Sequence, residues 1–125
     1  MQTFDFTGTR ILVVEDDSTN FLFLKILLNR ANADIIWAKS GAEALELMHQ
    51  NTDIKVILLD IQLPDMCGVD VAKTIKKEFP DKKIIVQTAF AMSGEREKIL
   101  EAGCDEYVSK PIDSKRLLSL IEQYR

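Results

Sequence analysis

The chain has 125 residues, of which 46% are hydrophobic and 29% are charged, and its formal net charge at pH 7 is −4. These totals indicate one globular domain with enough apolar material for a core that needs no disulfide or metal. The negative charge argues against a broad nucleic-acid surface, and no apolar run approaches the roughly 20 residues that span a bilayer, so we expect no direct nucleic-acid or membrane partner.

Residues 1–8 are interpreted as a short lead-in and residues 9–125 as one domain. The lead-in lacks the basic and apolar regions of a signal peptide, and Cys67 and Cys104 do not form a close pair. We therefore expect reduced thiols and a cytoplasmic location.

The first strand signal is the apolar run at residues 10–14, which ends on the acidic residues Glu15, Asp16 and Asp17. A helix is predicted over residues 19–31, capped by Asp17 or Ser18. Its apolar residues form a wide stripe, so we expect this helix to be deeply buried.

A short strand over residues 34–38 and a helix opened by Ser40 come next. Ser40 and Glu43 have the spacing of a capping box. The run Val56-Ile57-Leu58-Leu59 then ends abruptly on Asp60. Four apolar residues without alternation are typical of a strand buried on both faces of a parallel sheet.

The second half of the chain repeats the strand–helix order. A helix that Pro80 stops leads to a strand over residues 83–88. Ser93 is the expected cap of a polar helix over residues 94–102, which has few large apolar residues and should be held less firmly than the others. A last strand over residues 106–109 precedes Lys110-Pro111, and Asp113 caps the final helix.

Five strand–helix units in regular alternation predict an open, doubly wound α/β fold with a five-stranded parallel sheet. The flavodoxin-like strand order 2-1-3-4-5 is the expected topology, with its ligand site beside strands one and three. These are the two strands that end in acidic residues.

Side chains of complementary chemistry are predicted to meet at the carboxyl edge of this sheet: Glu15, Asp16, Asp60, Thr88 and Lys110. Clustered carboxylates repel one another, and a hard cation such as Mg²⁺ relieves the repulsion. With a lysine and a hydroxyl beside them, such carboxylates suit a site that receives a phosphoryl group on an aspartate.

The motifs ILVVEDD, VILLDIQLPDMCG, VQTA and YVSKP occur here in one order. In these motifs the chain resembles a response-regulator receiver domain of two-component signalling, over residues 9–124. The resemblance implies that Asp60 accepts a phosphoryl group from a phosphohistidine. It also implies that Asp16, Asp60 and the backbone carbonyl of Gln62 bind Mg²⁺ directly, with Mn²⁺ as an alternative, and that Glu15 acts through a bound water.

The resemblance further assigns the switch. Thr88 would move toward the phosphoryl oxygens, Tyr107 would change its rotamer in step, and Lys110 would pair with the phosphoryl group. The Lys110–Pro111 peptide bond would be cis, which is rare for X-Pro bonds. The surface of the last two helices and the last strand would then change for downstream partners.

Some positions depart from the commonest family pattern. Glu15 replaces the more usual Asp, and Cys67 stands where Asp is frequent. Gln62 and Phe90 lie two residues after Asp60 and Thr88, at positions that in this family tune hydrolysis of the phosphoaspartate. We expect the bulky Phe90 to hinder the attacking water and to lengthen the phosphorylated state.

Three other readings remain open. A haloacid-dehalogenase-like phosphatase also uses an Asp nucleophile, but it needs a second Asp where this chain has Gln62. A flavodoxin-type cofactor binder would place a flavin phosphate beside Glu15, Asp16 and Asp17, which would repel it. An unphosphorylated pseudo-receiver that only docks to partners would normally lose one of the key groups, and none is lost here.

The expected partners are a histidine kinase or a histidine phosphotransfer protein, and a downstream effector or an attached output or kinase domain. The lead-in and Asn20 resemble receivers of hybrid histidine kinases, so a full-length parent would be such a kinase. We predict no enzyme activity beyond self-catalysed phosphotransfer and slow autodephosphorylation.

Overall fold

The computed structural model describes residues 3–89 and 93–125, in which five strands alternate with five helices. The strands are β1 (Arg10–Val14), β2 (Asp34–Ala38), β3 (Ile54–Asp60), β4 (Lys83–Thr88) and β5 (Glu106–Ser109). The helices are α1 (Ser18–Arg30), α2 (Gly41–Gln50), α3 (Gly68–Glu78), α4 (Ser93–Glu101) and α5 (Ser114–Tyr124). The predicted alternation of strand and helix is confirmed.

All strand pairs are parallel, and the sheet order is β2-β1-β3-β4-β5, which confirms the predicted topology. The register aligns Val14 of β1 with Leu59 of β3. The residues that follow these two strands therefore leave the sheet side by side, at the point where the order of the strands reverses.

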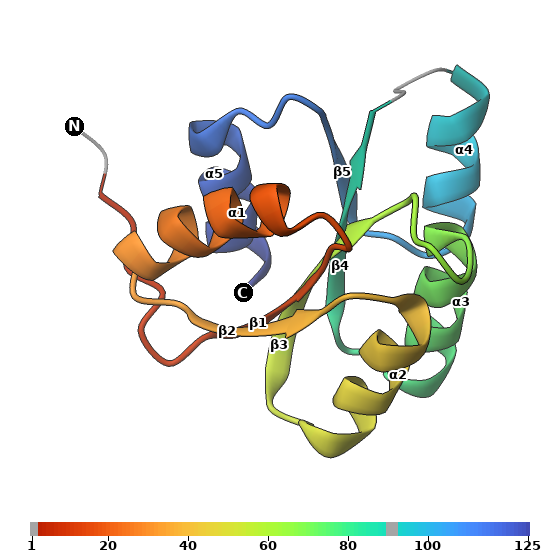
Figure 1. The fold of residues 1–125 in the computed structure, drawn as a ribbon, viewed down its shortest axis with the longest axis horizontal. Helices are drawn as coiled ribbons and strands as arrows, with labels where there is room; N and C mark the ends of the chain where they lie inside the picture. Colours follow the sequence, from red (N-terminus) through yellow and green to blue (C-terminus); the bar gives the residue numbers. More distant parts are fainter. Residues whose placement is uncertain (1–2, 90–92) are drawn as a thin grey trace.

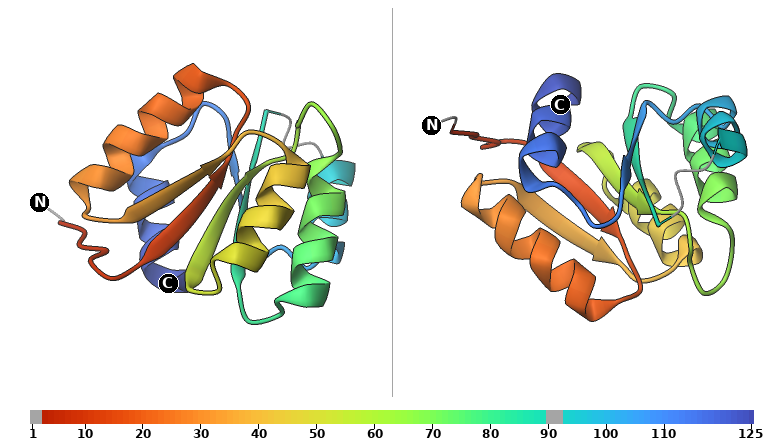
Figure 2. Two further views of the ribbon diagram at one scale, coloured as in Figure 1. Left: turned by 60° about the horizontal axis from the view of Figure 1, so that its bottom comes forward. Right: turned by 90° about the horizontal axis from the view of Figure 1, so that it is seen from above.

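Helices cover both faces of the sheet. Helices α1 and α5 lie on one face, and α2, α3 and α4 lie on the other (Figures 1 and 2). Successive side chains of a strand point to opposite faces, so Ile11 and Val13 join the core under α1 and α5, whereas Leu12 and Val14 join the other core. This division explains why β1 and β3 are apolar without alternation.

Helix α1 is less buried than its sequence predicts. Leu24 and Leu28 are fully buried, but Leu22, Phe23 and Ile26 expose 54%, 45% and 46% of their surface. The prediction of a deeply buried helix was therefore wrong. The helix packs on the sheet through the side that carries Leu24 and Leu28. Phe21 and Leu27 are partly buried against the same core, and only the three exposed residues face outward.

Three helix caps follow the sequence. The Asp17 carboxylate accepts from the amide of Thr19, and the Ser40 hydroxyl accepts from the amide of Glu43. Asp113 caps α5 in the same way. In contrast, α4 begins one residue earlier than predicted, because Ser93 is already helical, and it ends at Glu101. Phe90 lies outside the described residues.

The described part of the lead-in, residues 3–8, contacts the domain through its phenylalanines. Phe6 is fully buried in the core under α1 and α5, and its amide donates to the carbonyl of Ala31 over 2.6 Å. The guanidinium of Arg125 lies 5.5 Å from the centre of the Phe6 ring. Part of the lead-in thus shares the domain's core, and a boundary at residue 9 stays a prediction.

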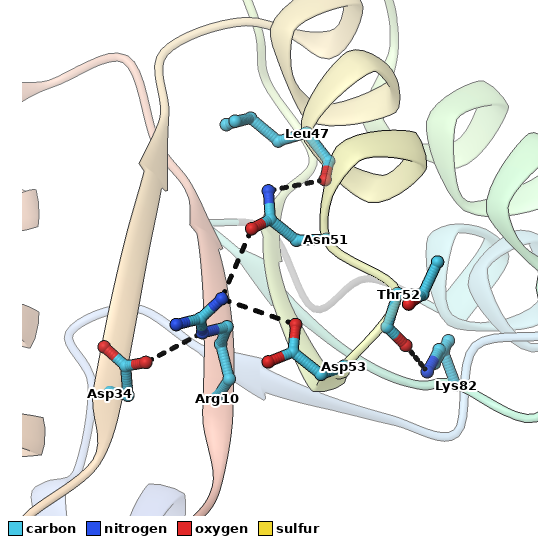
Figure 3. A network of polar contacts seen from close by, with 7 residues as sticks. All are labelled: Arg10, Asp34, Leu47, Asn51, Thr52, Asp53 and Lys82. Carbon is cyan, nitrogen blue, oxygen red and sulfur yellow. Dashed lines mark hydrogen bonds and ion pairs between the residues drawn. The ribbon is translucent and has the colours of Figure 1, made fainter.

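Ion pairs close the amino edge of the sheet. The Arg10 guanidinium lies between Asp34, at 2.7 Å, and Asp53, at 3.4 Å, and it also donates to the side chain of Asn51 (Figure 3). The Lys82 ammonium donates to the carbonyl of Thr52 over 2.7 Å. The loops at this edge are therefore tied together. None of the described helices has the length and apolar character of a membrane span.

Candidate functional site

Three carboxylates meet at the carboxyl edge of the sheet. Glu15 and Asp16 follow β1, and Asp60 is the last residue of β3. One oxygen of each lies within 4.8 Å of the others. Glu15 is fully buried, Asp60 is 4% exposed and Asp16 is exposed, so the cluster reaches from the core to the surface.

The cluster opens into a hollow of about 410 Å³. Its lining includes the loops after β1 and β3 and one residue after β5: Glu15, Asp16, Asp17, Asn20, Asp60, Gln62, Leu63, Pro64 and Lys110. Four of these residues are acidic and one is basic. The hollow therefore has the charge to attract a cation and the access to admit an outside group.

Asp60 is held by two donors. The Lys110 ammonium donates to Oδ2 over 2.8 Å, and the backbone amide of Gln62 donates to Oδ1 over 3.0 Å. Each carboxylate oxygen therefore has a defined partner. The lysine also offsets the negative charge of an aspartate that is almost completely buried.

Burial and the neighbouring Asp60 carboxylate raise the pKa of Glu15 from 4.5 to about 7, while Lys110 acts in the opposite direction. The ammonium of Lys110 lies 3.9 Å from Oε1 of Glu15, and that oxygen accepts no hydrogen bond from the described residues. This buried carboxylate oxygen can therefore still accept an interaction, and it lies beside two other carboxylates. Three such carboxylates form a set of oxygen ligands that fits a hard divalent cation. The residues present thus fit Mg²⁺.

The loop after β3 is folded tightly beneath Asp60. Gln62 pairs with Cys67 across the loop, and the amide of Gly68 donates to the carbonyl of Ile61 over 2.8 Å. A Cβ atom at Gly68 would lie 2.6 Å from the carbonyl oxygen of Asp60. Only glycine permits this approach without a backbone shift, so Gly68 contributes to the position of Asp60.

Thr88 and Lys110 are joined through the backbone. The amide of Lys110 donates to the carbonyl of Thr88 over 2.8 Å, and the Lys110–Pro111 peptide bond is cis. Thr88 is fully buried at the end of β4, the strand next to β3. It is not among the described residues that line the acidic hollow.

Tyr107 lies farther along the sheet, on β5. It is half-buried against the core under α2, α3 and α4, and the Arg96 guanidinium lies 5.8 Å from the centre of its ring. Among the described residues, the hollow thus brings together Glu15, Asp16, Asp60, Gln62 and Lys110, but neither Thr88 nor Tyr107.

Two contacts at this edge of the sheet were not predicted from the sequence. The indole N–H of Trp37, in β2, donates to the carbonyl of Glu15 over 2.7 Å. The ring of Phe21 stacks on Trp37 with ring centres 3.9 Å apart. The segment that carries Glu15 is thus fastened to β2 and α1. The only signal for this role was the presence of an indole donor near the end of a strand.

The second contact joins the loop after β3 to the start of α2. Asp65 accepts from the backbone amides of Gly41 and Ala42 over 2.8 and 2.9 Å. These two hydrogen bonds lower the pKa of Asp65. The first amides of a helix have no partner within the helix, so an acceptor was to be expected there, but no local pattern shows that it lies 24 residues away.

Comparison with known proteins agrees with this architecture. Residues 11–122 match the family model described as the response regulator receiver domain. A curated relative, the polar-differentiation response regulator DivK of Brucella ovis, is 37% identical over 116 residues, which cover 91% of this chain and 94% of the relative.

Solved receiver structures have the same fold. A CheY-like receiver domain from Methanospirillum hungatei has a TM-score of 0.86 and 31% identity, with 94% of this chain and 93% of that chain covered. The receiver domain of Ssk1 from Saccharomyces cerevisiae, solved with the histidine phosphotransfer protein Ypd1, has a TM-score of 0.87 and 27% identity, with 95% and 90% covered. The chain belongs to the response regulator receiver domain family and is a receiver domain of two-component signalling.

Proposed function

We propose that Asp60 accepts a phosphoryl group from a phosphohistidine on a partner protein, and that Thr88 and Lys110 assist the transfer. Asp16, Asp60 and the backbone carbonyl of Gln62 would hold Mg²⁺ directly, or Mn²⁺ in its place, and Glu15 would act through a water. The observation that carries this proposal is the buried Asp60 carboxylate, which lies beside two other carboxylates and within 2.8 Å of the Lys110 ammonium.

The chemistry is a displacement at phosphorus. A carboxylate oxygen of Asp60 forms a bond to phosphorus, the phosphorus–nitrogen bond of the phosphohistidine breaks, and the imidazole nitrogen keeps the electron pair. The cation, when bound, neutralises charge on the phosphoryl oxygens. Lys110 would stabilise the same charge, and Thr88 would donate a hydrogen bond to a phosphoryl oxygen.

The alternatives are less well supported. A haloacid-dehalogenase-like phosphatase would need a general acid where this chain has Gln62, whose side chain cannot supply a proton. A pseudo-receiver has no use for a lysine paired with a buried aspartate beside two further carboxylates. We therefore propose self-catalysed phosphotransfer and slow autodephosphorylation, without turnover of a free substrate.

The exposed apolar side of α1 supports a protein phosphodonor. Leu22, Phe23 and Ile26 form an apolar face on the helix that begins beside the acidic cluster, and Asn20 of this helix lines the acidic hollow. We propose that a helix of a histidine kinase or of a histidine phosphotransfer protein packs there and presents its phosphohistidine to Asp60. The Ssk1 receiver was solved with a phosphotransfer protein of this kind.

The output would be read at the other end of the sheet. We propose that Thr88 moves toward the phosphoryl group and that Tyr107 then changes its rotamer, which would change its contact with Arg96. A downstream effector, or an attached output or kinase domain, would recognise the altered surface of α4, β5 and α5. Both cysteines are free thiols, which is in keeping with a cytoplasmic location.

The test is phosphorylation of the purified chain with acetyl phosphate and Mg²⁺, followed by intact-mass measurement. We expect the wild type to gain one phosphoryl group and Asp60→Asn to gain none. Asp17→Asn, which removes an exposed carboxylate of the same hollow and keeps a capping side chain, should be phosphorylated like the wild type. A wild type that stays unmodified, or an Asp60→Asn variant that is modified equally, would exclude the proposal.

A further inference from the structure

A second hollow lies on the α1 and α5 face of the sheet, beside the acidic one. It has a volume of about 290 Å³, which is near the lower end of the range for small-molecule pockets. Four of its lining residues are apolar or proline: Phe23, Leu24, Pro111 and Ile112. Asn20, Gln87 and Lys110 complete the lining, so the hollow is mostly apolar with a few polar groups.

Gln87 is the unexpected member of this lining. It lies in β4 on the same side of the sheet as Ile85, and its side chain is fully buried. Neither the oxygen nor the nitrogen of its carboxamide has a hydrogen-bond partner among residues 3–89 and 93–125. Buried polar side chains are nearly always hydrogen-bonded. An apolar residue at this position of the strand would avoid the desolvation cost of an unpaired carboxamide.

The other polar groups of the hollow point to a neutral ligand. The Lys110 ammonium is engaged by Asp60 at 2.8 Å and lies 3.9 Å from Glu15, so its charge is already offset. A carboxamide offers an acceptor and a donor side by side in one plane. Its best complement is a second carboxamide, which presents the donor and the acceptor in the reverse order.

We propose that this hollow binds a primary carboxamide carried on a small apolar body, with the Gln87 carboxamide as its hydrogen-bond partner. The apolar body would pack between Phe23 and Leu24 of α1 and Ile112 of the β5–α5 loop. Such a group has two sources: a free small molecule, or the end of a glutamine side chain of a partner protein. The site does not depend on phosphoryl transfer at Asp60.

The test is a titration of the ¹⁵N-labelled chain followed by NMR, with benzamide as the probe of a free ligand. N-acetylglutamine methylamide is the probe of a partner's side chain, and acetophenone keeps the ring and the carbonyl of benzamide but lacks the N–H donors. We expect benzamide to bind with a dissociation constant on the order of 1 mM, as suits so small a ligand. The amides of Phe23 and Ile112 should shift.

We expect acetophenone to bind about tenfold more weakly than benzamide, and Gln87→Leu to weaken benzamide about tenfold, because each change removes hydrogen bonds between the ligand and a buried carboxamide. The tighter of the two carboxamide probes identifies the source. The proposal is overturned if neither carboxamide binds at this site, if acetophenone matches benzamide, or if Gln87→Leu leaves benzamide binding unchanged. The acetophenone comparison uses the wild type, so it holds even if the variant does not fold.

Discussion

The acidic cluster predicts an unusual dependence of stability on pH. Burial and the neighbouring Asp60 raise the pKa of Glu15 from 4.5 to about 7, so the folded chain binds this proton more tightly than the unfolded chain. Stability from this group is therefore fully present below pH 4.5 and is lost as the pH rises toward and through 7. We expect the Glu15→Gln variant, which keeps the shape and has no charge, to escape this loss.

The magnitude follows from the shift. Each pKa unit corresponds to about 1.4 kcal/mol, so Glu15 should lower the free energy of unfolding by about 2 to 3 kcal/mol between about pH 5 and about pH 8. The assay is urea unfolding of the metal-free wild type and Glu15→Gln at both pH values. The change in the free energy of unfolding between the two pH values is measured for each protein, and the two changes are compared. Contributions from titrating groups that both proteins share then cancel.

Asp17→Asn is the matched control, because it removes an exposed carboxylate two residues away and keeps a capping side chain. It should follow the wild type. The reasoning fails if Glu15→Gln loses as much stability as the wild type between the two pH values. Mg²⁺ should restore the stability of the wild type at the higher pH and do less for Glu15→Gln.

Three further predictions concern single substitutions elsewhere in the chain. Gly68→Ala should lower the free energy of unfolding in urea by roughly 1 to 3 kcal/mol, because the added Cβ would clash with the backbone of Asp60 and Ile61. An unchanged urea midpoint would show that the loop backbone can shift without loss of stability. Trp37→Phe, which removes the donor to the Glu15 carbonyl, should weaken Mg²⁺ binding severalfold by calorimetry, and equal affinity would mean that the indole only packs. Phe90→Glu should speed phosphate loss from the phosphorylated chain, and an unchanged rate would contradict a shielding role for Phe90.

Much of the fold follows from one property of the sequence. The runs at β1 and β3 are apolar without alternation because both of their faces are covered, and each run stops where the sheet stops. The acidic residues directly after these runs must then lie at the carboxyl edge. Glu15 and Asp60 could be placed together for this reason before any contact was known.

Other features depend on contacts between distant segments. The apolar stripe of α1 does not show which of its residues the sheet covers, so the exposure of Phe23 could not be predicted. The pairing of Asp65 with the start of α2 depends on how the loop after β3 folds back. Likewise, Gln87 looks like an ordinary strand residue in the sequence. Its carboxamide is buried without a hydrogen-bond partner among the described residues because of a helix and a loop that lie elsewhere in the chain.

The charges of the acidic hollow explain why a cation belongs to the proposed reaction. The lining holds four carboxylates and, among the described residues, one ammonium, that of Lys110. A phosphoryl group on Asp60 would replace one carboxylate charge with about two. The single ammonium that now faces both Asp60 and Glu15 cannot balance that increase. A divalent cation adds two positive charges at the place where the oxygens converge, so metal binding and phosphorylation should each strengthen the other.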